Sequence, residues 1–284
     1  MYNAYFGFSE CPFSLSPNPS FYFRSALHEE ALANLCYGIQ SRKGFIVLTG
    51  EVGTGKTTLL ECLRDSLDSQ HVAFAFLFNS RLTVDQFFQM IAYDLDLRCD
   101  KTSKTEVLFA LNSFLLEQAS QNRTTALIID EAHNLEWDVL EEVRLLGNLE
   151  TRHGKLLQIV LAGQTELDRK LDAPELRQLK QRIVLRSKLE AFSPADTERY
   201  IAARFEKAGM PDQTVFSPEI LSEIHFRSQG IPRLINSISD NLLLTCFALD
   251  CKMATLAMLD EVSRDLRLEW PEGRRALATA HPAF

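Results

Sequence analysis

Two kinds of apolar pattern alternate over the first two thirds of the chain. Short, nearly continuous apolar runs are typical of strands buried on both faces of a sheet. Between them, apolar residues recur every three or four positions, as they do on one face of a helix. Strands that alternate with helices predict an α/β fold, a parallel sheet with helices on both faces. The predicted strands are residues 45–48, 71–78, 125–130 and 156–161, and the predicted helices are residues 25–39, 57–67, 84–95, 104–118 and 136–151.

The pattern changes near Ala191. Beyond it the sequence has no strand-like run, and residues that favour helix starts stand at Ser193, Ser217 and Thr255. A further helix opens after Gly230. The predicted organisation is an N-terminal arm over residues 1–24, an α/β domain over 25–190, a small all-helical domain over 191–269 and a loose tail over 270–284.

The arm is rich in aromatic side chains and proline. Because prolines spaced along it exclude a regular helix, we predict an extended segment whose rings pack on the following domain. Stacking of one ring on an adenine base is the alternative. Just beyond the arm, His28 is predicted to be a solvated surface histidine rather than a nucleotide ligand.

The segment GFIVLTGEVGTGKTTLL, residues 44–60, joins a predicted strand to a predicted helix through a glycine-rich turn. It matches G-x-x-x-x-G-K-[ST], the pattern of a phosphate-binding loop. Glycines let backbone N–H groups surround a polyphosphate, the lysine reaches its β and γ phosphates, and the threonine hydroxyl ligates Mg²⁺. In this strand–loop–helix setting the pattern predicts a site for ATP and Mg²⁺ rather than a plain turn. The candidate nucleotide-binding residues are Gly50, Glu51, Val52, Gly53, Thr54, Gly55, Lys56, Thr57 and Thr58.

Polar side chains follow the next strands, at the edge where open parallel sheets bind ligands. Asp130 is predicted to hold Mg²⁺ together with Thr57, and Glu131 to activate the attacking water. Gln164 is a candidate for positioning that water, with a plain turn residue as the alternative. Arg177 and Arg182 follow later. Either is a candidate for an arginine offered to the phosphoryl group by a neighbouring subunit, although solvated surface arginines are the commoner case.

Composition limits the choice of function. The 284 residues carry a net charge of -8, which argues against a generally basic nucleic-acid surface. No apolar run approaches the roughly 18 residues of a transmembrane segment and no signal-like N-terminus is present, so we predict a cytoplasmic protein that reaches a membrane only through a partner.

The cysteines lack metal-type spacing and are expected to be free thiols. They are Cys11, Cys36, Cys62, Cys99, Cys246 and Cys251.

Together these motifs resemble an AAA+ ATPase, which implies a P-loop core followed by a helical lid. More narrowly, the sequence is similar to ATPases of the general secretion pathway protein A (ExeA) type, relatives of the transposition helper ATPases and the Cdc6/Orc initiators. The resemblance covers about residues 5–268. It rests, in order, on FGFSECPFSLSPNPSFYF, GFIVLTGEVGTGKTTLL, LIIDEAHNL, LLGNLET, AGQTEL, LRQLKQRI and GIPRLIN.

The resemblance also implies roles for single residues. Thr165 departs from the family's pattern, in which proline follows the sensor glutamine, and we expect this change to affect little beyond the start of the next helix. Longer members of the family add a membrane segment and a cell-wall-binding domain that this sequence does not contain. By resemblance, residues 50–57 are Walker A, Asp130 and Glu131 are Walker B, Gln164 is sensor 1, Arg233 is sensor 2, and Arg182 or Arg177 is the finger supplied in trans.

Three functions compete. The leading one is a homo-oligomeric ATPase that remodels or regulates an unidentified protein partner in a secretion or export assembly. A P-loop kinase is the second, and phosphate release without an acceptor would exclude it. The third is an ATP-dependent, DNA-associated helper of a transposase or recombinase. The acidic pI of about 5.4 disfavours this third function, whereas salt-sensitive, ATP-dependent DNA binding would support it.

Overall fold

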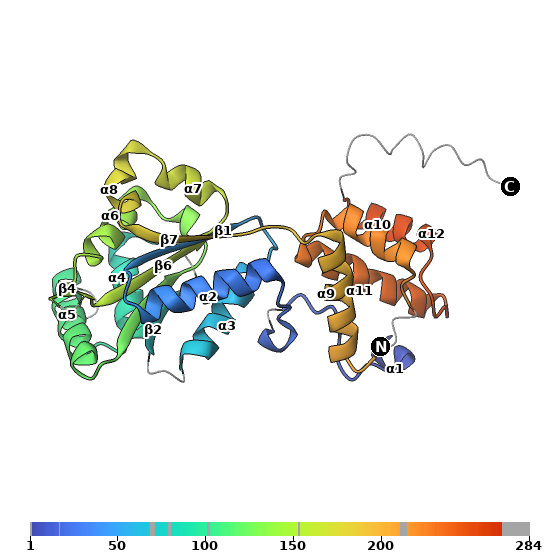
Figure 1. Cartoon of the computed structure of the whole chain (residues 1–284), viewed down its shortest axis with the longest axis horizontal. Helices are drawn as coiled ribbons and strands as arrows, with labels where there is room; N and C mark the ends of the chain where they lie inside the picture. The colour runs from blue at the N-terminus through green and yellow to red at the C-terminus, as the bar shows by residue number, and fades with distance from the viewer. Residues whose placement is uncertain are drawn as a thin grey trace. The chain divides into compact units, whose positions relative to one another are not determined.

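The structure, a computed structural model, describes residues 2–16, 18–68, 72–78, 81–100, 103–152, 154–210 and 215–268. The chain forms two compact units, one of Arg24–Glu190 and one of Met1–Phe23 with Ala191–Phe284. Figure 1 shows both units. The tail predicted over residues 270–284 lies outside the described residues. In the described part of the chain, no helix is long and apolar enough to cross a membrane.

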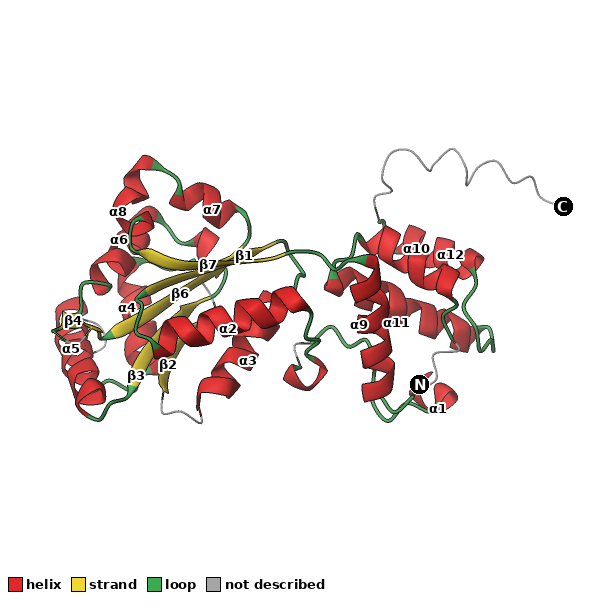
Figure 2. Ribbon diagram, viewed as in Figure 1, coloured by secondary structure: helices red, strands yellow, loops and turns green. Residues whose placement is uncertain are grey.

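A sheet of five parallel strands forms the centre of the first unit, in the order β2-β3-β6-β1-β7 (Figure 2). In β1, Thr49 lies opposite Gly163 of β6, and Ile129 of β3 lies opposite Leu161 of β6. The carboxyl ends of these strands therefore meet at one edge of the sheet. The α/β prediction is confirmed. The strands are β1 (Phe45–Gly50), β2 (Val72–Leu77), β3 (Thr124–Ile129), β6 (Leu157–Gly163) and β7 (Ile183–Leu189).

Helices cover both faces of this sheet (Figure 2). On one face, Gly38 of α2 lies directly against Ile46, because a Cβ at Gly38 would collide with that side chain. On the other, Phe45 and Val47 share a buried core with α4, α5 and α6. Successive residues of β1 thus point to opposite faces. The helices are α2 (Ala26–Gln40), α3 (Lys56–Asp68), α4 (Val84–Asp94), α5 (Lys104–Ser120), α6 (Trp137–Leu146), α7 (Glu166–Leu171) and α8 (Arg177–Lys180).

Two features of this unit differ from the sequence prediction. The helix predicted over residues 136–151 ends at Leu146, and a small hairpin follows, β4 (Glu150–Thr151) with β5 (Gly154–Lys155). Gly147, just past the helix end, packs so closely on Phe45 that a Cβ there would collide with the ring. Strand β7 was not predicted, because its exposed positions include the charged Arg186 and Lys188, as is usual for an edge strand.

The second unit is helical in its described part. Its helix starts are confirmed, since Ser193, Ser217 and Thr255 each accept a backbone N–H bond from the third residue of the following helix. The apolar sides of these helices meet in one core that includes Phe205, Ile235 and other residues. The helices are α9 (Pro194–Lys207), α10 (Pro218–Ser228), α11 (Pro232–Ala248) and α12 (Leu256–Asp265).

The N-terminal segment belongs to this helical unit, so the prediction that it packs on the α/β domain was wrong. Phe8 and Phe13 are buried in the helical core and both rings contact Phe205. These two rings are therefore not available to adenine. The segment also contains two short helices, α1 (Tyr2–Phe6) and η1 (Pro19–Phe21), and a helix forms at α1 because it precedes the first proline.

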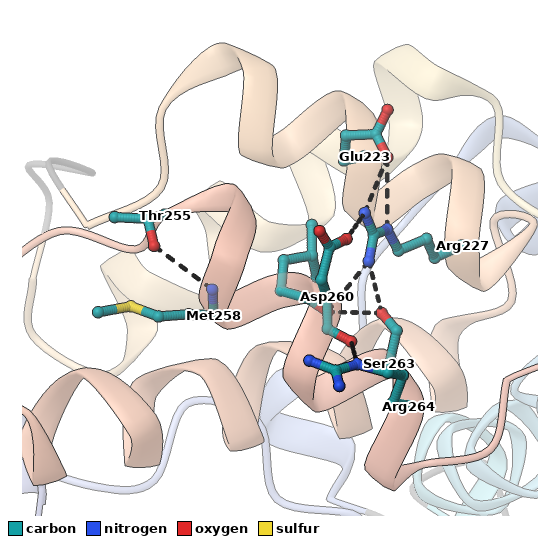
Figure 3. A network of polar contacts seen from close by, with 8 residues as sticks. Glu223, Arg227, Thr255, Met258, Asp260, Ser263 and Arg264 are labelled. Atoms are coloured by element: carbon teal, nitrogen blue, oxygen red, sulfur yellow. Dashed lines mark hydrogen bonds and ion pairs between the residues drawn. The ribbon is translucent and has the colours of Figure 1, made fainter. Parts of the chain in front are cut away.

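A buried arginine joins two helices of this unit (Figure 3). Arg227 of α10 donates to Asp260 Oδ1 of α12 at 2.6 Å, to Ser263 Oγ at 2.9 Å and to the Leu259 carbonyl at 3.1 Å. Glu223 Oε2 lies 3.3 Å from the same guanidinium, which is only 7% exposed. Each nitrogen of the Arg227 guanidinium has a hydrogen-bond acceptor, which is the condition for a buried charge to be tolerated.

We expect Arg227→Met to lower the free energy of unfolding by about 2 kcal/mol, because the ring of acceptors around it loses its charged donor. Urea unfolding followed by circular dichroism measures the change. Arg199→Ala is the matched control, because Arg199 makes an ion pair with Asp196 while 67% exposed, and exposed pairs contribute little. Equal losses in the two variants would contradict a stabilising role for the network.

Candidate functional site

The glycine-rich turn between β1 and α3 forms a tight loop. Gly53 and Gly55 adopt φ values of +82° and +96°, in the left-handed region that glycine enters without Cβ strain. Gly50 lies so close to β7 that a Cβ there would be 2.7 Å from the Leu189 carbonyl oxygen. Helix α3 begins at Lys56, directly after the loop, so its N-terminal N–H groups and positive dipole end lie beside it. This is the backbone arrangement of an anion site.

Lys56 is buried within this loop. Its Nζ donates to the carbonyls of Gly50 at 2.8 Å and Glu51 at 2.9 Å. Burial lowers the pKa of Lys56, while the nearby carboxylates of Glu131 and Asp130 act in the opposite direction. The loop therefore holds a charged amine in a desolvated position, where its attraction to an anion is strong.

Thr57 and Asp130 connect the loop to the end of β3. The Thr57 hydroxyl donates to Asp130 Oδ2 at 2.8 Å, although the two residues are 73 positions apart. Burial raises the pKa of Asp130, and its hydrogen bonds from Thr57 and from the Glu131 N–H act in the opposite direction. Among the residues the structure describes, no group of three or more His, Cys, Asp or Glu is arranged to hold a metal ion. One hydroxyl and one carboxylate fit Mg²⁺, which keeps several waters and binds substrate phosphates.

Glu131 and Gln164 are brought together at the same edge of the sheet. Gln164 Nε2 donates to Glu131 Oε2 over 3.4 Å, although these side chains follow different strands. Glu131 itself has φ 53°, a left-handed conformation uncommon for a side chain of this kind. The structure thus places the predicted base and the predicted sensor in contact.

Sequence reasoning missed His133, which lies 3.4 Å from the same Glu131 oxygen through Nε2. Its Nδ1 accepts the Gln164 backbone N–H at 3.3 Å. Since a nitrogen that accepts carries no hydrogen, a neutral His133 has its proton on Nε2, the nitrogen that faces Glu131. The only signal in the sequence was a histidine two positions after the glutamate, in DEAH.

Two expectations about single residues were wrong. The effect of Thr165 is not limited to the start of the next helix. Its hydroxyl donates to Glu51 Oε1 in the phosphate loop at 3.0 Å, a bond that proline cannot make. His28 is not solvated, being only 3% exposed. Its Nε2 lies 3.0 Å from the Thr54 carbonyl oxygen in the loop.

The arginine candidates lie elsewhere. Arg182 directly precedes β7, whose amino end pairs with Phe45 and whose carboxyl end pairs with Gly50. The seven residues of β7 place Arg182 about 20 Å from the loop of its own chain. Its guanidinium donates to Asn148 and to the Arg144 carbonyl at the end of α6. Arg177 is exposed at the start of α8.

The remaining candidates are placed as follows. Arg233 is exposed at the second residue of α11, in the helical unit, and its sensor role stays a prediction. Val52 is exposed in the loop, and Thr58 is half-buried in the first turn of α3. The six cysteines are free, as predicted.

The chain is similar in sequence to known proteins. Residues 39–171 match the family model described as AAA domain. The chain is 45% identical over 249 residues, 87% of its length, to General secretion pathway protein A of Aeromonas hydrophila, and spans 45% of that relative.

Solved structures with a similar fold include Cdc6p of Pyrobaculum aerophilum, with a TM-score of 0.70 and 18% identity, covering 94% of this chain and 73% of that one. ORC2 of Aeropyrum pernix has a TM-score of 0.64 and 15% identity, and the match covers 94% of this chain and 75% of that one. The Drosophila ORC bound to DNA has a TM-score of 0.63 and 20% identity, and the match covers 94% of this chain and 66% of that one.

Proposed function

We propose that this chain, which carries an AAA domain on the P-loop fold of the AAA+ ATPases, binds ATP with Mg²⁺ and hydrolyses it to ADP and phosphate. The observation that carries the proposal is the 2.8 Å hydrogen bond from Thr57 to Asp130. It joins the end of the phosphate loop to the carboxylate after β3, which are the two protein groups that hold Mg²⁺ in this class of site.

Each side chain then has a defined task. The loop N–H groups and the α3 dipole bind the phosphates, and Lys56 adds a positive charge. Glu131 accepts the proton of the attacking water, while Gln164 and His133 orient its carboxylate through Oε2. Bound Mg²⁺ supplies further charge for the oxygens of the transferring phosphoryl group.

We further propose that the protein works as a homo-oligomer. The distance of Arg182 from its own loop supports this, because an arginine at the opposite end of the sheet can reach a phosphate loop only in another subunit. Arg177 is the alternative finger, and Arg233 is proposed as sensor 2. Arg182 is already bound to the end of α6. Its release from those contacts is therefore part of the proposal.

The partner is proposed to be a protein of a secretion or export assembly, remodelled or regulated by ATP turnover at a cytoplasmic site. This rests on the 45% identity to General secretion pathway protein A, of which the chain spans 45%. A DNA-associated role is the alternative, since one similar structure is described as bound to DNA. Sizing the protein with a slowly hydrolysed ATP analogue, with and without duplex DNA, separates the two.

Lys56→Ala tests the nucleotide site itself. We expect the affinity for ATP to fall roughly 100-fold, because a desolvated positive charge is removed from the loop. Calorimetric titration measures the affinity, and circular dichroism verifies the fold. Lys188→Ala is the matched control, since Lys188 is 58% exposed on β7. Unchanged ATP affinity in a folded Lys56→Ala variant would exclude the proposed site.

A further inference from the structure

We propose that His28 is a positioning residue of the phosphate loop, which holds the Thr54–Gly55 peptide in the orientation that binds phosphate. The inference rests on the proposed nucleotide-binding function. His28 lies in the first turn of α2 and is 3% exposed. Its Nδ1 is 2.8 Å from Ser25 Oγ, and its Nε2 is 3.0 Å from the Thr54 carbonyl oxygen.

The contacts determine which atom donates. A carbonyl oxygen only accepts, so Nε2 of His28 carries a hydrogen and donates it to Thr54. In the neutral ring, Nδ1 then accepts the Ser25 hydroxyl hydrogen. The Ser25 oxygen meanwhile accepts the His28 backbone N–H at 3.4 Å, as the N-cap of α2. A continuous series of hydrogen bonds thus runs from the start of α2 into the loop.

The bond to Thr54 determines the direction of the next N–H group. In a trans peptide the C=O and the following N–H point in opposite directions. With the Thr54 carbonyl held toward α2, the Gly55 N–H points away from α2. Thr54 is also bound from within the loop, because its hydroxyl donates to the Glu51 carbonyl at 2.9 Å. The peptide is therefore fixed before a ligand arrives.

Gly55 shows how closely the imidazole is packed on the loop. A Cβ at this position would lie 3.3 Å from His28 Nε2. Any side chain at Gly55 would push against the ring, in addition to the strain at φ +96°. Helix α2 itself packs on the sheet through Gly38. The His28 ring therefore holds the loop in a fixed position relative to the sheet.

A matched pair of variants tests the role. The amide of His28→Gln extends far enough to replace Nε2 and donate to Thr54, whereas that of His28→Asn is shorter and replaces only Nδ1. We expect the affinity for ADP with Mg²⁺ to fall roughly tenfold in His28→Asn and to stay within roughly threefold of the wild type in His28→Gln. His28→Leu, which removes both bonds, should bind at least as weakly as His28→Asn.

Calorimetric titration with ADP measures the affinities, and thermal unfolding shows whether they merely follow stability. Asn34→Ala is the control on the same helix, since Asn34 donates to Ser187 of β7 at 3.3 Å and not to the loop, and it should bind ADP normally. Equal affinities in the Asn and Gln variants, or wild-type affinity in His28→Leu, would overturn the inference. If the wild type binds no nucleotide, or Lys56→Ala binds normally, the proposed function itself fails.

Discussion

Glu131→Gln is expected to bind ATP like the wild type and to turn it over at least about 100-fold more slowly, because glutamine keeps the shape of the side chain but cannot accept the proton of water. In the structure, glutamine at this position can keep the hydrogen bond that Glu131 accepts from Gln164. Gln164 Nε2 donates to Glu131 Oε2 over 3.4 Å, and the carbonyl oxygen of glutamine can accept the same bond. His133 Nε2 lies at the same distance from Oε2. Phosphate release at saturating ATP gives the turnover, and calorimetric titration gives the affinity.

The control is Glu136→Gln, which removes an exposed carboxylate five positions further along the chain and should change neither quantity. Loss of both binding and turnover in a folded Glu131→Gln variant would assign Glu131 a structural role instead. Turnover that survives the substitution would mean that another group activates the water.

The phosphate loop could be predicted because its determinants are local. A buried strand, glycines at the positions of positive φ and a helix start all lie within residues 44–60. The meeting of Thr57 with Asp130 followed from one further step, that parallel strands end at the same edge of a sheet. Each of these inferences needs only a short stretch of chain or a rule of sheet topology.

What could not be predicted depends on contacts between distant segments. The N-terminal segment packs on the helical unit, where the Pro12 carbonyl accepts a bond from Arg204, 192 positions away. Its prolines and rings indicated anchoring but not the surface to which it is anchored. His133 was missed, and His28 was wrongly predicted to be solvated, for the same reason. Histidine is polar, and its burial is decided by what the neighbouring element presents to it.

The arginine finger has the largest expected effect on turnover. Under the proposed mechanism, in which a neighbouring subunit stabilises the transferring phosphoryl group, Arg182→Ala should bind ATP nearly normally and lose roughly 10³-fold or more in hydrolysis. The intrachain bond to Asn148 offers a competing explanation, in which Arg182 only stabilises the end of α6. Asn148→Ala removes that partner and leaves Arg182 in place, so a finger role predicts that Asn148→Ala remains active.

Mixing two inactive variants gives the decisive measurement. Glu131→Gln lacks the base in its own site but presents an intact Arg182, whereas Arg182→Ala has an intact base. Together they should regain part of the wild-type activity at junctions where an intact site meets an intact arginine. If only assembled junctions turn over, as proposed, wild-type specific activity should also rise with protein concentration.

Activity that is independent of concentration, with no recovery on mixing, would reject a finger supplied in trans. Arg177→Ala is tested in the same way, because Arg177 is exposed at the start of α8. If recovery requires Arg177 and not Arg182, the finger is Arg177 and the contacts of Arg182 with Asn148 and the Arg144 carbonyl serve the fold. If it requires Arg182, those contacts must break when two subunits meet, and assembly is then coupled to a rearrangement at the end of α6.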